Sequence, residues 1–312
     1  MTVPEAIPAR VLPPLSVGAS PLGGAATTYG YDVEETVAIR TVQHLLASPV
    51  RSIDTSNQYS GGESERRIGR AIEASGGLPD DFVLATKADP LPGDTSFSGE
   101  RVRRSFLEST ARLGGARFGV FYLHDPEWFD FDTMVGPGSA VEAMVDLKRE
   151  GLVDAIGVAG GDLGEMRRYV DLGVFDVVLN HNRYTLLDRS AGSLIDHAIE
   201  SGVAFVNAAP YASGILARPA AARPTYRYRP PSYEIVATTA RLREACARHD
   251  VPLPAVALQF STRDTRIAST VVGVSAPQRV DELVENDRIR VPADLWNEVA
   301  DIIDTDLSHL ST

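Results

Sequence analysis

The sequence is poor in cysteine and in long apolar runs, and each shortage restricts what the protein can be. Its single cysteine, Cys246, cannot form an internal disulfide, which agrees with a reducing compartment. Cys246 lies in the helix-patterned segment RLREACARHD, which predicts a buried structural residue rather than a nucleophile. No apolar run approaches membrane-spanning length, and the N-terminus lacks the charged start and apolar core of a signal peptide. We therefore predict a cytoplasmic protein with no membrane partner.

Basic residues are also few relative to acidic ones. The chain has 30 Lys and Arg residues against 42 Asp and Glu residues, which gives a formal net charge of −12. Nucleic acids and anionic membranes bind through basic patches, so this balance argues against either as the main partner. It leaves room for an anionic cofactor that is held by a few local donors.

What the 312 residues do contain is a regular alternation of β-rich runs and amphipathic stretches. Eight runs are expected as strands, at residues 14–20, 50–56, 82–88, 118–125, 155–160, 176–182, 203–209 and 269–275. Helix patterns separate them, at 33–48, 64–75, 99–114, 139–151, 164–173, 190–202, 235–250 and 277–286. Eight such units predict a (β/α)8 TIM barrel that forms one domain over residues 1–312.

The structural alternative is an open, doubly wound sheet. Such sheets often carry G-x-G-x-x-G after the first strand, and this chain has no such motif there. The nearest segment, PPLSVGASPLGG at 13–24, has the wrong spacing for a dinucleotide loop. We interpret it as a tight turn after the first strand, which favours the closed barrel.

Four polar residues lie where the second, third and fourth predicted strands give way to loops. Asp54 and Tyr59 occur in RSIDTSNQYSGG, Lys87 in FVLATKADP and His124 in FGVFYLHDP. The carboxyl ends of neighbouring strands meet at one end of a parallel barrel, so these side chains should converge. Each residue alone has an ordinary structural explanation, but together they predict a proton-transfer site. A metal site using Asp125 is the alternative, and no H-x-x-x-H or clustered Cys/His supports it, so no metal is expected.

This series of Asp-x4-Tyr, Thr-Lys and an apolar run ending in His-Asp resembles the aldo-keto reductase family. The resemblance extends over nearly the whole chain and implies hydride transfer between NAD or NADP and a carbonyl or alcohol carbon. Tyr59 would be the acid/base, and Lys87 would lower the pKa of its phenol. Asp54 would orient Lys87 and keep it protonated, while His124 Nε2 would hydrogen-bond the substrate oxygen.

The resemblance also implies a set of cofactor contacts. The family's Ser-Asn pair after the fifth strand is Ala159-Gly160 here, and its Gln in the sixth strand falls near His181. The loop after the seventh strand would cross the pyrophosphate, and the segment after the eighth would bind the adenosine. The family's frequent Lys before that segment is Val274 in this chain, which leaves the choice between NAD and NADP open. The predicted contacts are His181, Pro210, Tyr211, Ser213, Gly214, Ser275, Gln278, Arg279 and Glu282.

Three aromatic residues, Tyr29, Trp128 and Phe129, are expected at the mouth of the barrel, where a small polar or sugar substrate would pack against them. The long Arg- and Tyr-rich segment 216–233 is either a surface insertion or a flap whose arginines approach the cofactor.

Within the family, PTYRYRPPSYEI, LREACARHDVPLPAVALQF and GVSAPQRVDEL most resemble aldose 1-dehydrogenases, which act on L-fucose and D-threo-aldoses, and pyridoxal 4-dehydrogenase. General aldehyde or ketone reduction is the second possibility. A dinucleotide-binding accessory or sensor protein with little turnover is the third. The oligomeric state is left open.

Overall fold

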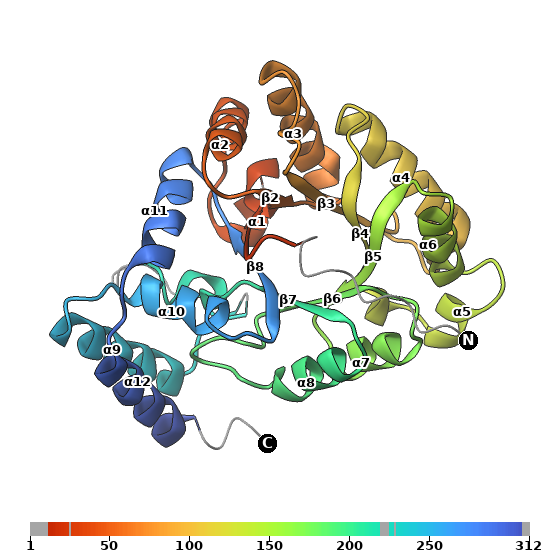
Figure 1. Cartoon of the computed structure of the whole chain (residues 1–312). Helices are drawn as coiled ribbons and strands as arrows, with labels where there is room; N and C mark the ends of the chain where they lie inside the picture. Colours follow the sequence, from red (N-terminus) through yellow and green to blue (C-terminus); the bar gives the residue numbers. More distant parts are fainter. Residues whose placement is uncertain (1–11, 25, 219–224, 228, 308–312) are drawn as a thin grey trace.

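The computed structural model describes residues 12–24, 26–218, 225–227 and 229–307. In this part of the chain, parallel strands pair in sequence order, and β1 closes onto β8 to make a barrel. Helices surround the strands (Figure 1). The predicted barrel is confirmed, and each predicted strand corresponds to one of these: β1 Leu15–Gly18, β2 Ser52–Asp54, β3 Val83–Ala88, β4 Phe118–His124, β5 Val153–Gly160, β6 Val177–His181, β7 Ala204–Ala208 and β8 Ile267–Gly273.

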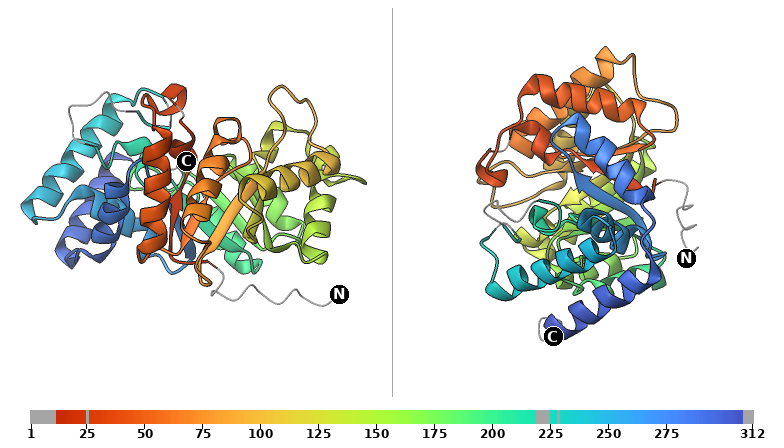
Figure 2. Two further views of the ribbon diagram at one scale, coloured as in Figure 1. Left: turned by 90° about the horizontal axis from the view of Figure 1, so that it is seen from above. Right: turned by 90° about the vertical axis from the view of Figure 1, so that its left-hand side faces the viewer.

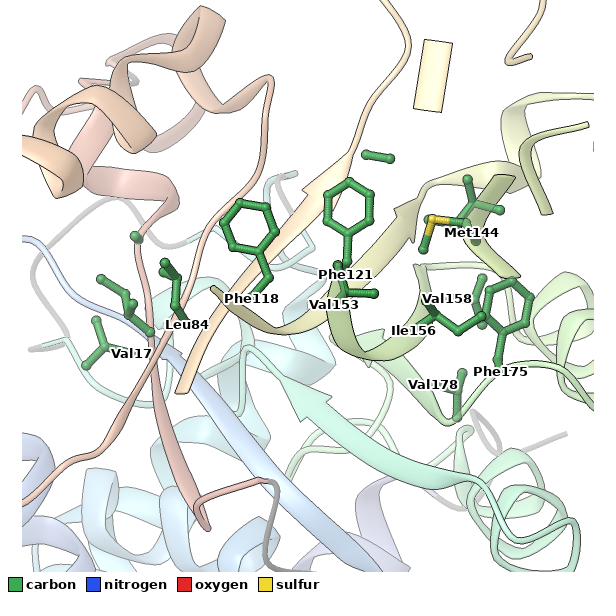
Figure 3. Packing of buried hydrophobic residues seen from close by; sticks show 14 of the residues in the cluster. Val17, Leu84, Phe118, Phe121, Met144, Val153, Ile156, Val158, Phe175 and Val178 are labelled. Carbon is green, nitrogen blue, oxygen red and sulfur yellow. The ribbon is translucent and has the colours of Figure 1, made fainter. Parts of the chain in front are cut away.

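Side-chain alternation along the strands divides the core into two layers. Outward-facing residues such as Phe121, Ile156 and Val178 pack under the helices, as Figure 3 shows. Inward-facing residues such as Val120 and Leu179 fill the barrel itself. Because the period of a strand is two, the same alternation turns Lys87 and His124 inward at the strand ends.

The predicted helices form with start and stop positions close to those expected. Capping side chains explain several starts: Ser98, Ser139, Asp162 and Ser232 each accept a hydrogen bond from a backbone N–H of the first turn. The helices are α1 Ala26–Tyr29, α2 Glu35–Ala47, α3 Glu63–Ala74, α4 Gly99–Arg112, α5 Phe131–Val135, α6 Ala140–Arg149, α7 Leu163–Asp171, α8 Gly192–Glu200, α9 Tyr233–Arg248, α10 Leu253–Thr262, α11 Pro277–Arg288 and α12 Ala293–Asp306. None of the helices in these described ranges is long and apolar enough to cross a bilayer.

Two long helices, α10 and α12, were not among the predicted ones. Helix α10 is apolar on most of its faces because it lies between α9 and β8, so its amphipathic period is weak. Helix α12 packs on α9, outside the repeating barrel order, and shares a separate apolar cluster with it. In the views of Figure 2, both helices lie with α9 at one side of the molecule. Cys246 lies in this cluster, and burial raises its pKa to about 11, which agrees with the predicted structural role.

Backbone strain gathers at the carboxyl ends of the strands. Short 3-10 turns follow several strands there, including Ser20–Gly23 after β1, where a tight turn was predicted. Non-glycine residues with left-handed φ occur in the loops after β2, β4, β6 and β7: Ser60, Asp125, Asn182, Ala209, Ala212 and Ser213. Such conformations cost free energy and are typical of functional loops, so this end of the barrel is where the site should be.

Candidate active site

The Lys87 ammonium is the centre of the polar cluster. The register pairs β3 with both β2 and β4, so Asp54, Lys87 and His124 project from three adjacent strands. Lys87 Nζ donates to Asp54 Oδ1 at 2.5 Å, to the Thr55 carbonyl at 2.7 Å and to the Tyr59 hydroxyl at 3.3 Å. All three ammonium protons therefore have acceptors, although the side chain is only 2% exposed. This arrangement favours a charged Lys87 despite its burial.

Tyr59 reaches the cluster from the loop after β2. It begins the turn Tyr59–Gly62, in which Ser60 and Gly61 adopt left-handed φ angles of 53° and 63°. The Tyr59 ring lies 4.9 Å from Lys87 Nζ and 5.7 Å from the His124 ring, edge to face. The four predicted residues are thus brought together, with the phenol between an ammonium and an imidazole.

The pKa of the Tyr59 phenol shifts in the direction opposite to the predicted one. Burial raises its pKa well above the ordinary 10, and the Asp54 carboxylate raises it further. The prediction took the Lys87 cation as the dominant influence on the phenol, whereas burial dominates and Asp54, 2.5 Å from the ammonium, neutralises much of its charge. In this geometry, Tyr59 is a fully protonated donor at neutral pH, which suits it to give a proton to a developing alkoxide.

A fifth residue, Asp89, belongs to the site and was not predicted. Asp89 Oδ1 lies 2.6 Å from His124 Nδ1, and both side chains are largely buried. Burial opposes ionisation of the imidazole, but the carboxylates of Asp125 and Asp89 raise the pKa of His124 to about 9. The signal in the sequence is Asp89 itself, two residues beyond Lys87 in TKADP and so just past the end of the strand.

His181, from the end of β6, provides a contrasting imidazole. Burial lowers the pKa of His181, so it is neutral where His124 is charged. Its Nδ1 lies 3.0 Å from Asn182 Nδ2, a donor, which leaves the ring proton on Nε2. The Nε2 side of the ring lies beside Gly161, at the end of β5, where an added Cβ would come within 3.2 Å of it. His181 therefore presents an N–H at the rim between β5 and β6.

Glu127 fills the space beside the Ala159-Gly160 pair. Its Oε1 accepts from the backbone N–H groups of Gly161 at 2.6 Å and Asp162 at 3.3 Å. The absence of a side chain at Gly160 leaves the space that the Glu127 carboxylate occupies, because an added Cβ would overlap Glu127 Oε2. Glu127 Oε2 and Asn182 Oδ1 are buried without hydrogen-bond partners among the described residues. The rim of the barrel near His181 thus has one donor and two spare acceptors, which fits the N–H and C=O groups of a carboxamide.

The loop after β7 runs toward α11, as the pyrophosphate prediction requires. Burial raises the pKa of Tyr211, and the nearby charges that affect it include Glu282 and Arg279 of α11. Pro210 is buried, and left-handed backbone at Ser213 and Gly214 turns the chain sharply. Arg218 stands beside Gly214, with its guanidinium 5.4 Å from the Tyr31 ring. Arg218, from the start of the predicted flap, is a cation that was not assigned individually from the sequence.

The predicted adenosine contacts differ in their exposure and in their partners. Arg279 Nη1 donates to Glu282 Oε2 at 2.5 Å on the surface of α11, so these two residues contact each other. Gln278 is exposed, and Ser275 is half-buried. Val274 is 2% exposed and belongs to the core layer under the helices. A lysine placed at this position would start from the core layer, so replacing Val274 would affect packing as well as charge.

The three predicted substrate aromatics do not share one environment. Trp128 is 78% exposed, whereas Phe129 packs against Phe97 at 5.7 Å and contacts the core layer. The Tyr29 hydroxyl donates to Ser20 Oγ at 2.8 Å, and its charge is one of those that affect the pKa of Tyr59. The placement of all three at the mouth of the barrel, against a substrate, stays a prediction, and the Phe129 ring already has a packing partner in Phe97.

Part of the predicted flap, residues 219–224 and 228, lies outside the described residues. That range includes Arg223. Of the flap's other arginines, Arg227 lies 3.5 Å from Asp188 Oδ2, and Arg229 is exposed. Within the described ranges, no group of three His, Cys, Asp or Glu side chains is arranged to hold a metal ion.

A barrel with Tyr59, Lys87, Asp54 and His124 at the carboxyl ends of its strands defines a class of proton-coupled redox enzyme. The sequence matches the Aldo/keto reductase family over residues 14–304, and the chain belongs to that family. It is an NAD(P)-dependent oxidoreductase. The resemblance inferred from the sequence is therefore confirmed.

Named relatives support the predicted subgroup. The chain is 31% identical to a D-threo-aldose 1-dehydrogenase of Pseudomonas sp, over 93% of this chain and 94% of the relative. It is 30% identical to the L-galactose dehydrogenase of Arabidopsis thaliana, over 86% and 82% of the two chains. It is 26% identical to the pyridoxal 4-dehydrogenase of Microbacterium luteolum, over 90% and 91%. A solved aldo-keto reductase from Bacillus halodurans in its holo form shares the fold, with a TM-score of 0.74, 23% identity and coverage of 93% and 92%.

Proposed function

We propose that this protein interconverts a sugar or sugar-like carbonyl compound and the corresponding alcohol or lactone, with Tyr59 as the acid/base. One observation carries the proposal: the Tyr59 hydroxyl lies 3.3 Å from Lys87 Nζ, and the His124 ring lies 5.7 Å from the Tyr59 ring. When bound, the nicotinamide dinucleotide supplies or accepts the hydride. The residues of the chain handle the proton and the charge on oxygen.

In the reductive direction, negative charge develops on the carbonyl oxygen as the new C–H bond forms. Tyr59 Oη–H gives its proton to that oxygen, and His124 Nε2–H stabilises the charge with a hydrogen bond. Lys87 then stabilises the tyrosinate that remains, because its Nζ–H already points at the phenol oxygen. Asp54 holds Lys87 in place through its own hydrogen bond. The reverse sequence removes a proton from an alcohol or hemiacetal hydroxyl.

The proposed cofactor contacts follow the rim of the barrel from β5 to α11. His181 Nε2–H and the spare acceptors near it would bind the nicotinamide carboxamide. Pro210, Tyr211, Ser213 and Gly214, with Arg218, would lie along the pyrophosphate. On α11 and just before it, the adenosine would meet Ser275, Gln278, Arg279 and Glu282. Since Arg279 is paired with Glu282 and Val274 is buried, we expect NAD to be used at least as well as NADP.

A polyhydroxylated substrate is supported by the relatives and by the polar rim. Two named relatives act on sugars, a D-threo-aldose and L-galactose. Asp125, which has a left-handed φ of 45° and a side chain 40% exposed, lies 3.8 Å from His124 Nε2. It is therefore available to accept hydrogen bonds from substrate hydroxyl groups beside the reacting oxygen. Tyr29 and Trp128 would cover the sugar ring.

A substrate panel tests the function. Purified protein with NAD and with NADP is assayed against D-threo-aldoses, L-galactose, pyridoxal and simple aldehydes, following the absorbance of the reduced nicotinamide. We expect kcat/KM to be highest for an aldose, and Tyr59→Phe to abolish the signal. Higher kcat/KM for simple aldehydes would favour the general reductase. Dinucleotide binding without turnover of any compound would favour the accessory or sensor protein.

We also propose that residues 1–312 form one domain and that the protein is cytoplasmic. Limited proteolysis tests the first, since a single cooperative unit should resist cleavage between its barrel elements. Cell fractionation of the tagged full chain tests the second.

A further inference from the structure

Asp89 is a buried carboxylate that the proposed reaction does not use directly, and its surroundings fix it in position. Its Oδ2 accepts from Ser56 Oγ–H and from the Gln58 backbone N–H at 3.0 Å. Its backbone N–H donates to Ser105 Oγ, and its carbonyl accepts from Arg101 Nε. With every polar group of Asp89 engaged, its Oδ1 is held 2.6 Å from His124 Nδ1.

These contacts determine which nitrogen of His124 carries a proton. The single hydroxyl proton of Ser56 goes to Asp89, so Ser56 Oγ can only accept at its 3.3 Å contact with His124 Nδ1. Both neighbours of Nδ1 are therefore acceptors, and Nδ1 must be the N–H. In a neutral ring, the other nitrogen, Nε2, would then have no proton and could not donate to a carbonyl oxygen.

The charges that face His124 favour a second proton on the ring. Asp89, just after β3, and Asp125, just after β4, supply two carboxylates. The Lys87 ammonium, on β3, disfavours a charged ring, but Asp54 pairs with that ammonium and reduces its effect. Two further titratable neighbours, Tyr59 and His181, are neutral at pH 7 because burial raises the pKa of the phenol and lowers that of the imidazole. Asp89 is more buried than Asp125, with 8% against 40% of its side chain exposed, so solvent screens it less.

We propose that Asp89 is a positioning residue that holds His124 as an imidazolium, with Nδ1–H on the carboxylate and Nε2–H directed at the substrate oxygen. Asp89 touches neither substrate nor cofactor and acts only through His124. The effect of Asp89 on catalysis rests on the proposed function, whereas its effect on the protonation of His124 does not. Asp89 makes His124 a charged donor that stabilises alkoxide, and no proton leaves the ring during turnover.

The ring state is measured first, in the unliganded protein. Long-range ¹H–¹⁵N spectra of histidine-labelled protein are recorded from pH 5 to 10.5, and His124→Gln assigns the signal. We expect the His124 midpoint near pH 9, and a midpoint at least one pH unit lower in Asp89→Asn. Above the midpoint, the wild-type ring should keep its proton on Nδ1. An unchanged midpoint in Asp89→Asn, or a neutral ring protonated on Nε2, would overturn the proposal.

The midpoint and the tautomer of the wild-type ring do not require Asp89→Asn, so they test the proposal even if that variant fails to fold. Asp81→Asn is the matched control, because Asp81 precedes the same strand but lies exposed at its other end, paired with Arg51. It should leave the His124 titration and the kinetics unchanged.

The kinetic readout is the pH profile of carbonyl reduction. Burial keeps Tyr59 protonated far into the alkaline range, so the first alkaline loss of kcat/KM should report His124. In Asp89→Asn, this loss should begin at least one pH unit lower, with a fall of ten-fold or more at pH 8. A pH profile of unchanged shape in Asp89→Asn would contradict the claim that Asp89 affects carbonyl reduction through His124. A wild type without turnover would count against the proposed function alone, because the ring titration does not depend on it.

Discussion

Lys87 Nζ lies 3.3 Å from the Tyr59 hydroxyl and only 2.5 Å from Asp54 Oδ1, so the cation nearest the phenol is already matched by a carboxylate. Two possible roles of Lys87 must therefore be distinguished: stabilising a tyrosinate during the reaction, and lowering the resting pKa of the phenol. Lys87 hydrogen-bonds the tyrosine oxygen and can stabilise a tyrosinate that forms during reaction. Its charge does not bring the resting pKa of Tyr59 below the ordinary value, because burial and Asp54 together raise that pKa.

Replacing Tyr59 with phenylalanine tests the proton donor. The variant keeps the ring but loses the transferable proton, so kcat should fall by about 10²–10⁴-fold with little change in dinucleotide affinity. Steady-state kinetics and a fluorescence titration measure the two quantities. Tyr169→Phe is the control, because its buried hydroxyl has no partner among the described residues and lies outside the site. Residual activity within a few-fold of wild type would exclude Tyr59 as the acid.

Replacing Lys87 with methionine tests the cation. Asp54 would be left as a buried carboxylate without its partner, so the free energy of unfolding should fall by about 3–5 kcal/mol. Oxidative turnover should suffer more at neutral than at alkaline pH, because ionising the phenol becomes harder without the ammonium. The double variant Asp54→Asn/Lys87→Met should recover stability and still lack activity. Recovery of activity in the double variant would contradict the role of Lys87.

The Asp89–His124 pair should make stability depend on pH. The pKa of His124 is raised from 6.5 to about 9 in the folded protein, so its contribution is complete below pH 6.5 and is lost as the pH rises through 9. The lowered pKa of Asp89 gives a contribution that is present above pH 3.8 and is lost as the pH falls further. Urea unfolding at pH 6 and pH 9.5 should differ by up to about 3 kcal/mol. Asp89→Asn should reduce that difference, and an undiminished difference would assign it to other groups.

The Arg279–Glu282 pair predicts how cofactor choice can be changed. Glu282→Gln removes the carboxylate that occupies Arg279, so the guanidinium becomes available for a 2′-phosphate. An exposed pair of this kind is worth up to about 1 kcal/mol, so the ratio of NADP to NAD affinity should rise by up to about five-fold. Dissociation constants for both dinucleotides measure it.

Val274→Lys is a poorer test of the same question, because Val274 is in the core and the variant should lose stability. A wild type that already binds NADP far more tightly than NAD would place the phosphate on other cations, such as Arg218. That outcome would also contradict the proposed adenosine contacts.

Alanine substitutions at the neighbouring residues Trp128 and Phe129 should have opposite effects on stability and on substrate preference. Trp128→Ala removes an exposed ring, so the melting temperature should hardly change while kcat/KM for aldoses falls relative to simple aldehydes. Phe129→Ala removes a ring packed on Phe97, so it should cost about 3 kcal/mol of stability and affect every substrate alike. Equal losses for all substrates in Trp128→Ala would remove it from the substrate site.

The sequence by itself determined the barrel and the tetrad. Each strand run is apolar and short, and its period of two turns Lys87 and His124 inward whatever the details of packing. Their positions at strand ends follow from the same pattern, so Asp54, Lys87 and His124 were found without coordinates. The tight turn after β1 and the buried Cys246 were equally local inferences.

Only the tertiary structure decided the electrostatics and the partners. The raised pKa of Tyr59 depends on its burial and on the nearby Asp54 carboxylate, and the role of Asp89 depends on its facing His124 from a neighbouring strand end. Burial of Val274 and packing of Phe129 on Phe97 likewise depend on contacts within the folded core. The physical reason is that periodicity fixes the direction of a side chain. A charge interaction or a core contact also requires a distance, and the closure of the barrel sets that distance.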